Sequence, residues 1–135
     1  MYISETSLRV RYSETDQMGY VYYGNYASYY EVARVESLRQ LGLTYREIEE
    51  MGVMMPVLEN RSKYLAPARY DDLLRIVTTL REKPGVRIRF EYQIFNAENV
   101  LIHQGETILV FINKLTNRPC RQPPAMEKAL ERFFE

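Results

Sequence analysis

The sequence predicts an α+β domain in which a curved antiparallel sheet wraps around one long helix. Three observations lead to this prediction: a single long helical pattern between Asn25 and Leu41, several strand patterns from residue 53 to residue 113, and turn-forming residues between those strands. A chain of 135 residues is long enough to bury one hydrophobic core but too short for two of adequate size. Helix and strands must therefore share that core, and curving the sheet around the helix is the economical arrangement.

The first two predicted elements are a strand and the long helix. Residues 2 to 12 predict a strand because Leu8, Val10 and Tyr12 alternate with polar residues. In the helix, a face of apolar and small residues recurs at steps of three and four, and Gly42 stands where a helix would stop. The predicted inner face comprises Tyr26, Tyr30, Ala33, Ser37, Leu38 and Leu41, and the outer face Glu31, Arg34, Glu36 and Arg39.

A short helix and an interrupted strand are expected next. Residues 44 to 51 form a short amphipathic segment. A strand is predicted from Val53 to Tyr64, and Pro56 near its start implies an edge strand or a bulge, because proline cannot donate a ladder hydrogen bond.

Three long strands are expected to form an antiparallel meander. Residues 86 to 95 alternate with a strict period of two, and their apolar side consists of Val86, Ile88, Phe90, Tyr92 and Ile94. Turn-type residues stand on both sides, so strands over 73 to 80 and 100 to 113 should pair with this central one. Gly105 marks a bulge or a close approach of another group. Residues 125 to 134 predict a closing helix.

The composition excludes several classes of protein. The chain has 18 basic and 18 acidic residues, so its formal net charge is zero. It therefore has no overall electrostatic attraction for nucleic acid or for an anionic membrane. The single Cys120 cannot form an internal disulfide, and the single His103 cannot build a His/Cys metal site. The N-terminus shows no secretory apolar region, and no run of apolar residues is long enough to span a membrane. We expect a cytoplasmic protein that binds no nucleic acid.

The segment YSETDQMGYVYYGNY, residues 12 to 26, is the densest cluster of unusual residues. Its acid at position 16 stands on a turn ahead of the long helix, where unpaired amides and the positive end of the helix dipole are expected. A carbonyl oxygen against those amides would be stabilised as negative charge develops, while Asp16 supplied the attacking or proton-abstracting group. Helix capping by Thr15, Asp16 or Asn25 explains the same residues without chemistry.

Two motifs, Y-x-E-T-D-x-M-G-x-V-Y-Y-G-N-Y at residues 12 to 26 and Y-L-A-P-A-R-Y-D-D at residues 64 to 72, resemble the hotdog-fold acyl-CoA thioesterases of the 4-hydroxybenzoyl-CoA thioesterase-like family. The likeness covers nearly the whole chain. It implies a single hotdog thioesterase domain over residues 1 to 135, hydrolysis of acyl-CoA, and no metal or redox cofactor. Relatives pair their sheets, which leads us to expect a homodimer or homotetramer with the site at the subunit boundary.

The resemblance also assigns roles to particular residues. The essential aspartate of the family falls on Asp16, and the backbone amide that polarises the thioester carbonyl falls on Tyr23, with the Gly24 amide close behind. Asp16 would either attack the thioester to give a mixed anhydride or activate a water molecule, and both routes stay open. The second hypothesis is a non-catalytic hotdog module that binds acyl-CoA or an acyl carrier protein.

Substrate contacts are expected from Tyr20, Tyr22 and Asn25. Relatives often carry valine, isoleucine or histidine where this chain has Tyr20, so their acyl preference cannot be transferred to it. Basic side chains near the strand ends suit the phosphates of coenzyme A, and the expected set is Arg61, Lys63, Lys83 and Arg87.

Other polar residues are expected to be structural. Glu14 would share a strand face with Asp16 if the first strand continued that far, and could then tune or solvate it, but it is interpreted as a solvent-exposed acid. Another branch of hotdog thioesterases uses a glutamate of the helix as its catalytic acid, but Glu31 is interpreted as the ion-pair partner of Arg34 or of the neighbours of Val35. Arg69 should brace its loop through Asp71 or Asp72. His103 is interpreted as a structural residue within its strand.

Overall fold

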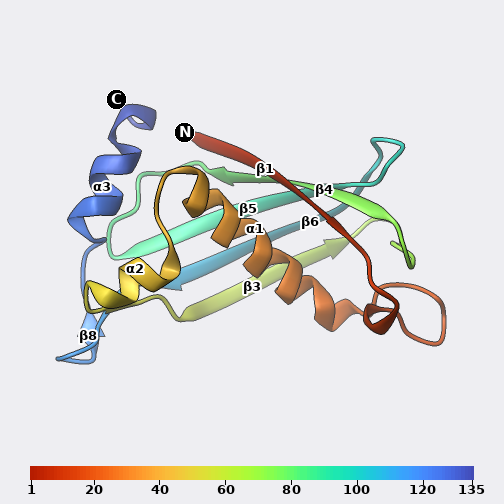
Figure 1. The fold of residues 1–135 in the computed structure, drawn as a ribbon, viewed down its shortest axis with the longest axis horizontal. Helices are drawn as coiled ribbons and strands as arrows, with labels where there is room; N and C mark the ends of the chain where they lie inside the picture. The colour runs from red at the N-terminus through yellow and green to blue at the C-terminus, as the bar shows by residue number, and fades with distance from the viewer.

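A computed structural model describes all of residues 1–135 (Figure 1). A five-stranded sheet with strand order β1-β4-β5-β6-β3 has every neighbouring pair antiparallel. Figure 1 shows the long helix α1 lying across one face of this sheet, which confirms the predicted α+β architecture. The main elements are β1 (Tyr2–Arg9), α1 (Tyr26–Gln40), β3 (Val57–Tyr64), β4 (Leu73–Leu80), β5 (Arg87–Phe95) and β6 (Leu101–Val110).

A second, small sheet lies at one end of the molecule. Two predicted strands are interrupted: residues 53 to 64 break at Pro56, and residues 100 to 113 break at Phe111. The pieces beyond each break leave the large sheet and pair in the order β2-β7-β8. The remaining elements are α2 (Tyr45–Glu50), β2 (Val53–Met54), β7 (Ile112–Asn113), β8 (Arg118–Pro119) and α3 (Pro124–Leu130), followed by a 3-10 turn at Glu131–Phe133. None of the helices combines the length and apolar character needed to cross a membrane.

The core lies between α1 and the inner face of the sheet. The predicted alternation in β5 is confirmed, because Ile88, Phe90, Tyr92 and Ile94 are all buried. Val86, which was expected on the same side, precedes the strand and is 40% exposed. The residues that α1 buries against this layer are Tyr26, Tyr29, Tyr30, Ala33, Arg34, Ser37 and Leu38.

The prediction that Arg34 lies on the outer face of the helix is wrong. Arg34 is only 6% exposed, and its Nε donates to the Tyr45 hydroxyl at 3.1 Å. Its expected partner Glu31 is exposed and forms no ion pair. Position 34 is four residues from both Tyr30 and Leu38, so helical periodicity places it inward, and α2 folds back to cover it with Tyr45. The charge of Arg34 therefore led to the wrong prediction of its exposure.

Strand β3 forms one edge of the large sheet. All eight of its residues are exposed, and only β6 pairs with it. Pro56 precedes the strand, and the register shifts between Val57 and Glu59, so both the edge position and the bulge predicted from Pro56 are found. An edge strand leaves unpaired backbone groups that can accept another strand.

Gly105 on β6 allows a tyrosine of α1 to approach the backbone. A Cβ atom at this position would lie 2.1 Å from the Tyr30 hydroxyl oxygen, which confirms the predicted close approach. That hydroxyl is 2.6 Å from Ser62 Oγ on β3 and 2.5 Å from His103 Nε2 on β6. The missing side chain of Gly105 therefore lets Tyr30 link the helix to two strands.

We predict that Gly105→Ala destabilises the protein. The methyl group would displace the Tyr30 ring, and overpacking of a core costs about 1–3 kcal/mol. Urea unfolding should show this loss in the free energy of unfolding. The matched control is Gly85→Ala, because an added Cβ there meets nothing within 4 Å. Equal stability of the two variants would contradict the close approach.

Candidate active site

A tight hairpin precedes the long helix. The Asp16 amide donates to the Tyr20 carbonyl and the Gly19 amide donates to the Asp16 carbonyl, each at 2.9 Å. Gly19 has a φ of +79°, a left-handed conformation that glycine adopts without strain. Thr15 and Val21 pair as a bridge below this turn. The hairpin brings the chain from Asp16 back to the start of α1.

The two oxygens of the Asp16 carboxylate have different surroundings. Oδ1 accepts a hydrogen bond from the Met18 amide at 2.9 Å, which is an Asx-type turn within the hairpin. Oδ2 accepts no hydrogen bond from the protein, and the residue is only partly buried. One oxygen therefore holds the turn while the other stays available to a bound molecule.

Two free amides stand at the start of the helix. Tyr23–Asn25 form a 3-10 turn that runs directly into α1, and its first hydrogen bond is from the Asn25 amide to the Tyr22 carbonyl at 2.9 Å. The amides of Tyr23 and Gly24 precede that bond and donate none. A helix start with unpaired N–H groups attracts negative charge.

The capping interpretation is wrong for this helix start. No side chain caps α1. Asn25 Nδ2 donates instead to the Glu14 carbonyl at 2.7 Å, and Thr15 Oγ1 donates to the Tyr12 carbonyl at 2.8 Å. The Asp16 side chain is engaged within its own hairpin. None of the three side chains satisfies the free amides.

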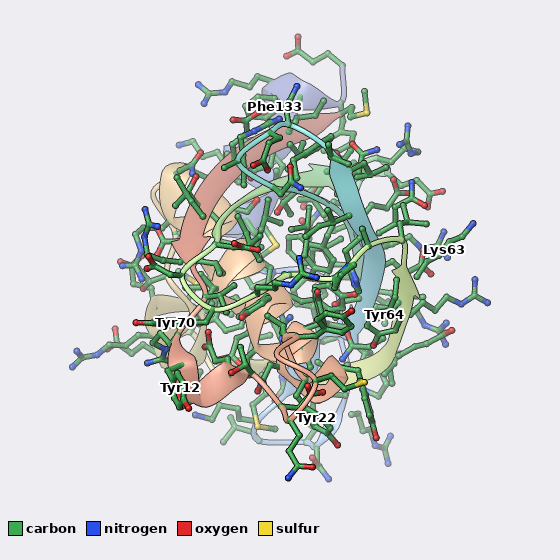
Figure 2. All side chains as sticks on the ribbon, turned by 90° about the vertical axis from the view of Figure 1, so that its right-hand side faces the viewer. Tyr12, Tyr22, Lys63, Tyr64, Tyr70 and Phe133 are labelled. Atoms are coloured by element: carbon green, nitrogen blue, oxygen red, sulfur yellow. The ribbon has the colours of Figure 1, made fainter.

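Tyr22 directly precedes the two free amides, and its ring contacts Gly24. A Cβ atom at Gly24 would lie 2.7 Å from Cε2 of the Tyr22 ring, so that ring rests against the glycine. The neighbouring Tyr23 phenol is the main cause of a raised pKa of Tyr22, and the Asp16 carboxylate adds to the rise. Figure 2 views this end of the molecule, with Tyr22 on the segment ahead of α1 and Tyr64 to one side of it.

An apolar cavity of about 280 Å³ lies beside the hairpin. Six of its seven lining residues are hydrophobic, and the lining comes from the hairpin, from α1, from the last residue of β3 and from the segment that follows β3. The lining is Tyr20, Val21, Tyr26, Tyr64, Leu65, Ala66 and Pro67. Among the residues expected to bind substrate, Tyr20 lines this cavity, whereas Tyr22 and Asn25 do not.

A buried aromatic cluster lies next to the cavity. The His103 ring is fully buried and stacks on Tyr26, with 4.0 Å between ring centroids and 6° between planes. Tyr64 meets the same imidazole edge-on at 4.9 Å. Burial lowers the pKa of His103 to about 4, so the imidazole is neutral near pH 7. The sequence offered no sign of its Tyr30 partner, which is 73 residues away along the chain.

The second motif, residues 64 to 72, supports the hairpin. The Val21 amide donates to the Ala68 carbonyl at 2.8 Å, and the Arg69 guanidinium lies 5.3 Å from the centre of the Tyr20 ring. The expected brace from Arg69 to Asp72 exists, but it uses the main chain: the Arg69 amide donates to Asp72 Oδ2 at 2.8 Å. The two motifs, about fifty residues apart in the sequence, therefore contact each other in the fold.

The four basic residues expected at coenzyme A form two separate groups. Arg61 and Lys63 flank Ser62, whose hydroxyl faces inward to Tyr30, so they point from β3 to the outer face of the sheet. They line a shallow hollow of about 230 Å³, and Figure 2 shows Lys63 at this edge. Lys83 and Arg87 line a different hollow of about 150 Å³. Arg61 pairs with Glu59 at 2.9 Å and Lys83 with Glu127 at 3.4 Å.

A family model with the description thioesterase-like superfamily matches residues 10–130. The chain belongs to the thioesterase-like superfamily. The acyl-CoA thioester hydrolase YbgC of Escherichia coli is 34% identical to it, over 88% of this chain and 89% of the relative. The structure of a DHNA-CoA thioesterase from Staphylococcus aureus superimposes with a TM-score of 0.93 and 32% identity, over 98% of this chain and 91% of that one. A gentisyl-coenzyme A thioesterase, BH1999, gives a TM-score of 0.84 and 25% identity, over 93% of this chain and 98% of that one.

These comparisons confirm the resemblance inferred from the two motifs, and they confirm the hotdog fold. In this member of the thioesterase-like superfamily, the hairpin that carries Asp16 and the amides of Tyr23 and Gly24 all lie within the matched residues. No group of three or more His, Cys, Asp or Glu side chains is placed to hold a metal ion.

We predict a pH dependence that originates in the single histidine. The pKa of His103 is about 4 in the folded protein and 6.5 without perturbation, so the unfolded chain binds a proton between these values that the folded chain does not. This contribution to stability is fully present above pH 6.5 and is lost as the pH falls toward 4, by about 2 to 3 kcal/mol.

The measurement is urea unfolding of wild type and His103→Gln at pH 7.5 and pH 4.5. The loss of free energy on acidification should be larger for wild type, because acidic residues that titrate in this range are the same in both proteins. An NMR titration of the imidazole in the folded protein with a midpoint near 6.5 would contradict the account.

Proposed function

We propose that this protein hydrolyses acyl-CoA thioesters, with Asp16 as the general base or nucleophile and the Tyr23 and Gly24 amides as the oxyanion site. The observation that carries the proposal is a free carboxylate oxygen in a hairpin that leads directly to two free amides, beside an apolar cavity. The names of relatives such as the acyl-CoA thioester hydrolase YbgC support the same reaction.

In the proposed reaction, the acyl group occupies the apolar cavity. The thioester carbonyl oxygen accepts hydrogen bonds from the Tyr23 and Gly24 amides, which are preorganised because the 3-10 turn already fixes them. Negative charge that develops on this oxygen also lies at the positive end of the α1 dipole. The amides therefore stabilise the tetrahedral transition state more than the ground state, which lowers the barrier.

Asp16 can act by two routes from the same position. As a general base, it takes a proton from water while that water attacks the carbonyl carbon, and the CoA thiolate leaves and is protonated. As a nucleophile, its Oδ2 attacks the carbonyl carbon, CoA thiolate leaves, and water then cleaves the mixed anhydride. Both routes convert the thioester and water into a carboxylic acid and free CoA.

Tyr20 and Tyr22 form the proposed walls around the reacting group. Tyr20 lines the acyl cavity and is held by the Arg69 guanidinium, while Tyr22 covers Gly24. Asn25 holds the segment ahead of the helix in place and does not contact the substrate, because its side chain donates a hydrogen bond to the Glu14 carbonyl. For the CoA phosphates we favour Arg61 and Lys63, since Lys63 is adjacent to the cavity-lining Tyr64; Lys83 and Arg87 form a separate group.

The proposal includes a homodimer or homotetramer. The edge strand β3 is fully exposed, unpaired on one side, and ends at the cavity through Tyr64. Pairing with a second copy would satisfy its free backbone groups and bring the partner close to the cavity. Either CoA or an acyl carrier protein can present the thioester to such a site.

We predict that Asp16→Asn strongly slows hydrolysis. The amide has no negative charge with which to attack or to accept a proton, so kcat should fall by about 100-fold or more. Free thiol release from a panel of acyl-CoAs gives the rate, and circular dichroism checks the fold. If the protein is instead a non-catalytic binding module, wild type will bind acyl-CoA without releasing thiol. Unchanged hydrolysis in Asp16→Asn would contradict the mechanism.

We also predict an assembly of two or more chains. Light scattering at micromolar protein concentration should give at least twice the mass of the 16.1 kDa chain. A dilution series serves as the control, because a weak contact would dissociate within it. A monomer throughout the series would argue against pairing through β3.

A further inference from the structure

Glu14 connects the hairpin to the helix start through its main chain. Its carbonyl oxygen accepts a hydrogen bond from the Tyr22 amide at 2.9 Å, which closes the hairpin. The same oxygen accepts a second bond from Asn25 Nδ2 at 2.7 Å. Glu14 therefore contacts both the returning arm of the hairpin and the 3-10 turn that opens the helix.

The side chain of Glu14 makes a second connection, which the sequence did not predict. Only 13% of it is exposed, so the interpretation as a solvent-exposed acid is wrong. Oε1 accepts hydrogen bonds from the Arg11 amide at 2.8 Å and from the Tyr29 hydroxyl at 3.0 Å, while Oε2 binds the Arg11 guanidinium at 3.2 Å. Tyr29 is a buried residue of α1.

The electrostatics of this contact favour the charged carboxylate. Burial alone would raise the pKa of Glu14, but hydrogen bonds from the Arg11 amide, the Tyr29 hydroxyl and the Arg11 side chain outweigh it and lower that pKa. Burial and then the adjacent carboxylate raise the pKa of Tyr29, which keeps its hydroxyl protonated as the donor. The bond between hairpin and helix is therefore charge-assisted near neutral pH.

We infer that Glu14 is a positioning residue for catalysis, holding Asp16 at a fixed place relative to the free amides of Tyr23 and Gly24. Glu14 is two residues before Asp16. It contacts Arg11 ahead of the hairpin, Tyr22 on the returning arm and Tyr29 on the helix. Any rotation of the hairpin would shift the Asp16 carboxylate relative to the Tyr23 and Gly24 amides. A shift of about 1 Å can cost about 100-fold in rate, because the reacting atoms lose their alignment.

This inference rests on the proposed hydrolase activity. It differs from a role in stability alone, because a positioning residue affects kcat more than KM or folding. The substrate contacts made by the cavity do not involve Glu14, so binding should survive its loss. The two oxygens also differ in role: Oε1 makes the positional bonds, whereas Oε2 binds only the exposed Arg11 guanidinium.

The test compares four variants by acyl-CoA hydrolysis. Glu14→Ala removes both Oε1 bonds, and kcat should fall about 10- to 100-fold with KM changed less than about twofold. Glu14→Gln keeps an oxygen that can accept both bonds, and its kcat should stay within about threefold of wild type. Tyr29→Phe removes the bond from the helix side alone and should lower kcat about 3- to 10-fold.

Glu5→Ala is the matched control. Glu5 also pairs with an arginine, Arg75, at 3.0 Å, but it lies on β1 and does not touch the hairpin, so kcat should be unchanged. Melting temperatures accompany every assay. If Glu14→Ala fails to fold, Tyr29→Phe decides the question, because it changes only one hydroxyl group.

The outcomes separate the two proposals. Wild-type protein that releases no thiol from any acyl-CoA overturns the proposed function and the inference with it. Active wild type with kcat unchanged in Glu14→Ala or Tyr29→Phe overturns the inference alone. A Glu14→Gln variant as impaired as Glu14→Ala would also overturn it, because charge rather than the Oε1 bonds would then be responsible.

Discussion

The hydrogen bonds that tie residues 14 to 22 to the start of α1 are the constraint on which the candidate site depends. Within this segment, the Gly19 turn reverses the chain, and the Glu14 carbonyl joins the returning arm to the 3-10 turn. The free oxygen of Asp16 and the free amides then belong to one hydrogen-bonded unit rather than to two separate loops. In the proposed reaction, groups held in this way would need little reorganisation, which is the main advantage a protein site has over water.

The rest of the fold supports this unit from three sides. The loop at residues 66 to 72 donates and accepts main-chain hydrogen bonds below the hairpin, and Arg69 covers Tyr20. Strand β3 brings Tyr64 to the wall of the cavity. Behind it, Tyr30 links α1 to β3 and β6, which is possible only because residue 105 has no side chain. The same contacts therefore pack the helix against the sheet and shape the cavity.

Periodicity and turn residues were sufficient to predict the long helix, the meander and the edge strand, because these depend on local patterns. Arg34 and Glu14 were wrongly placed because both were judged by charge: each is buried by a tyrosine from a helix, a contact that only the tertiary structure creates. The strand breaks at Pro56 and Phe111 follow from pairing in a second small sheet. The motif resemblance singled out residues 12 to 26 and 64 to 72, but it predicted neither the hairpin nor its support by the second segment. No pattern indicated that Oδ1 of Asp16 would hold the turn while Oδ2 accepts no hydrogen bond from the protein.

The proposed placement of the substrate can be tested by a crystal structure with a non-hydrolysable acyl-CoA analogue, in which a ketone replaces the thioester. We expect the carbonyl oxygen of the analogue within about 3 Å of the Tyr23 or Gly24 amide, its acyl group in the cavity beside Tyr20, and Asp16 Oδ2 facing the carbonyl carbon. An analogue bound with its carbonyl away from both amides, or with the Asp16 side chain turned away from it, would rule out the proposed mechanism.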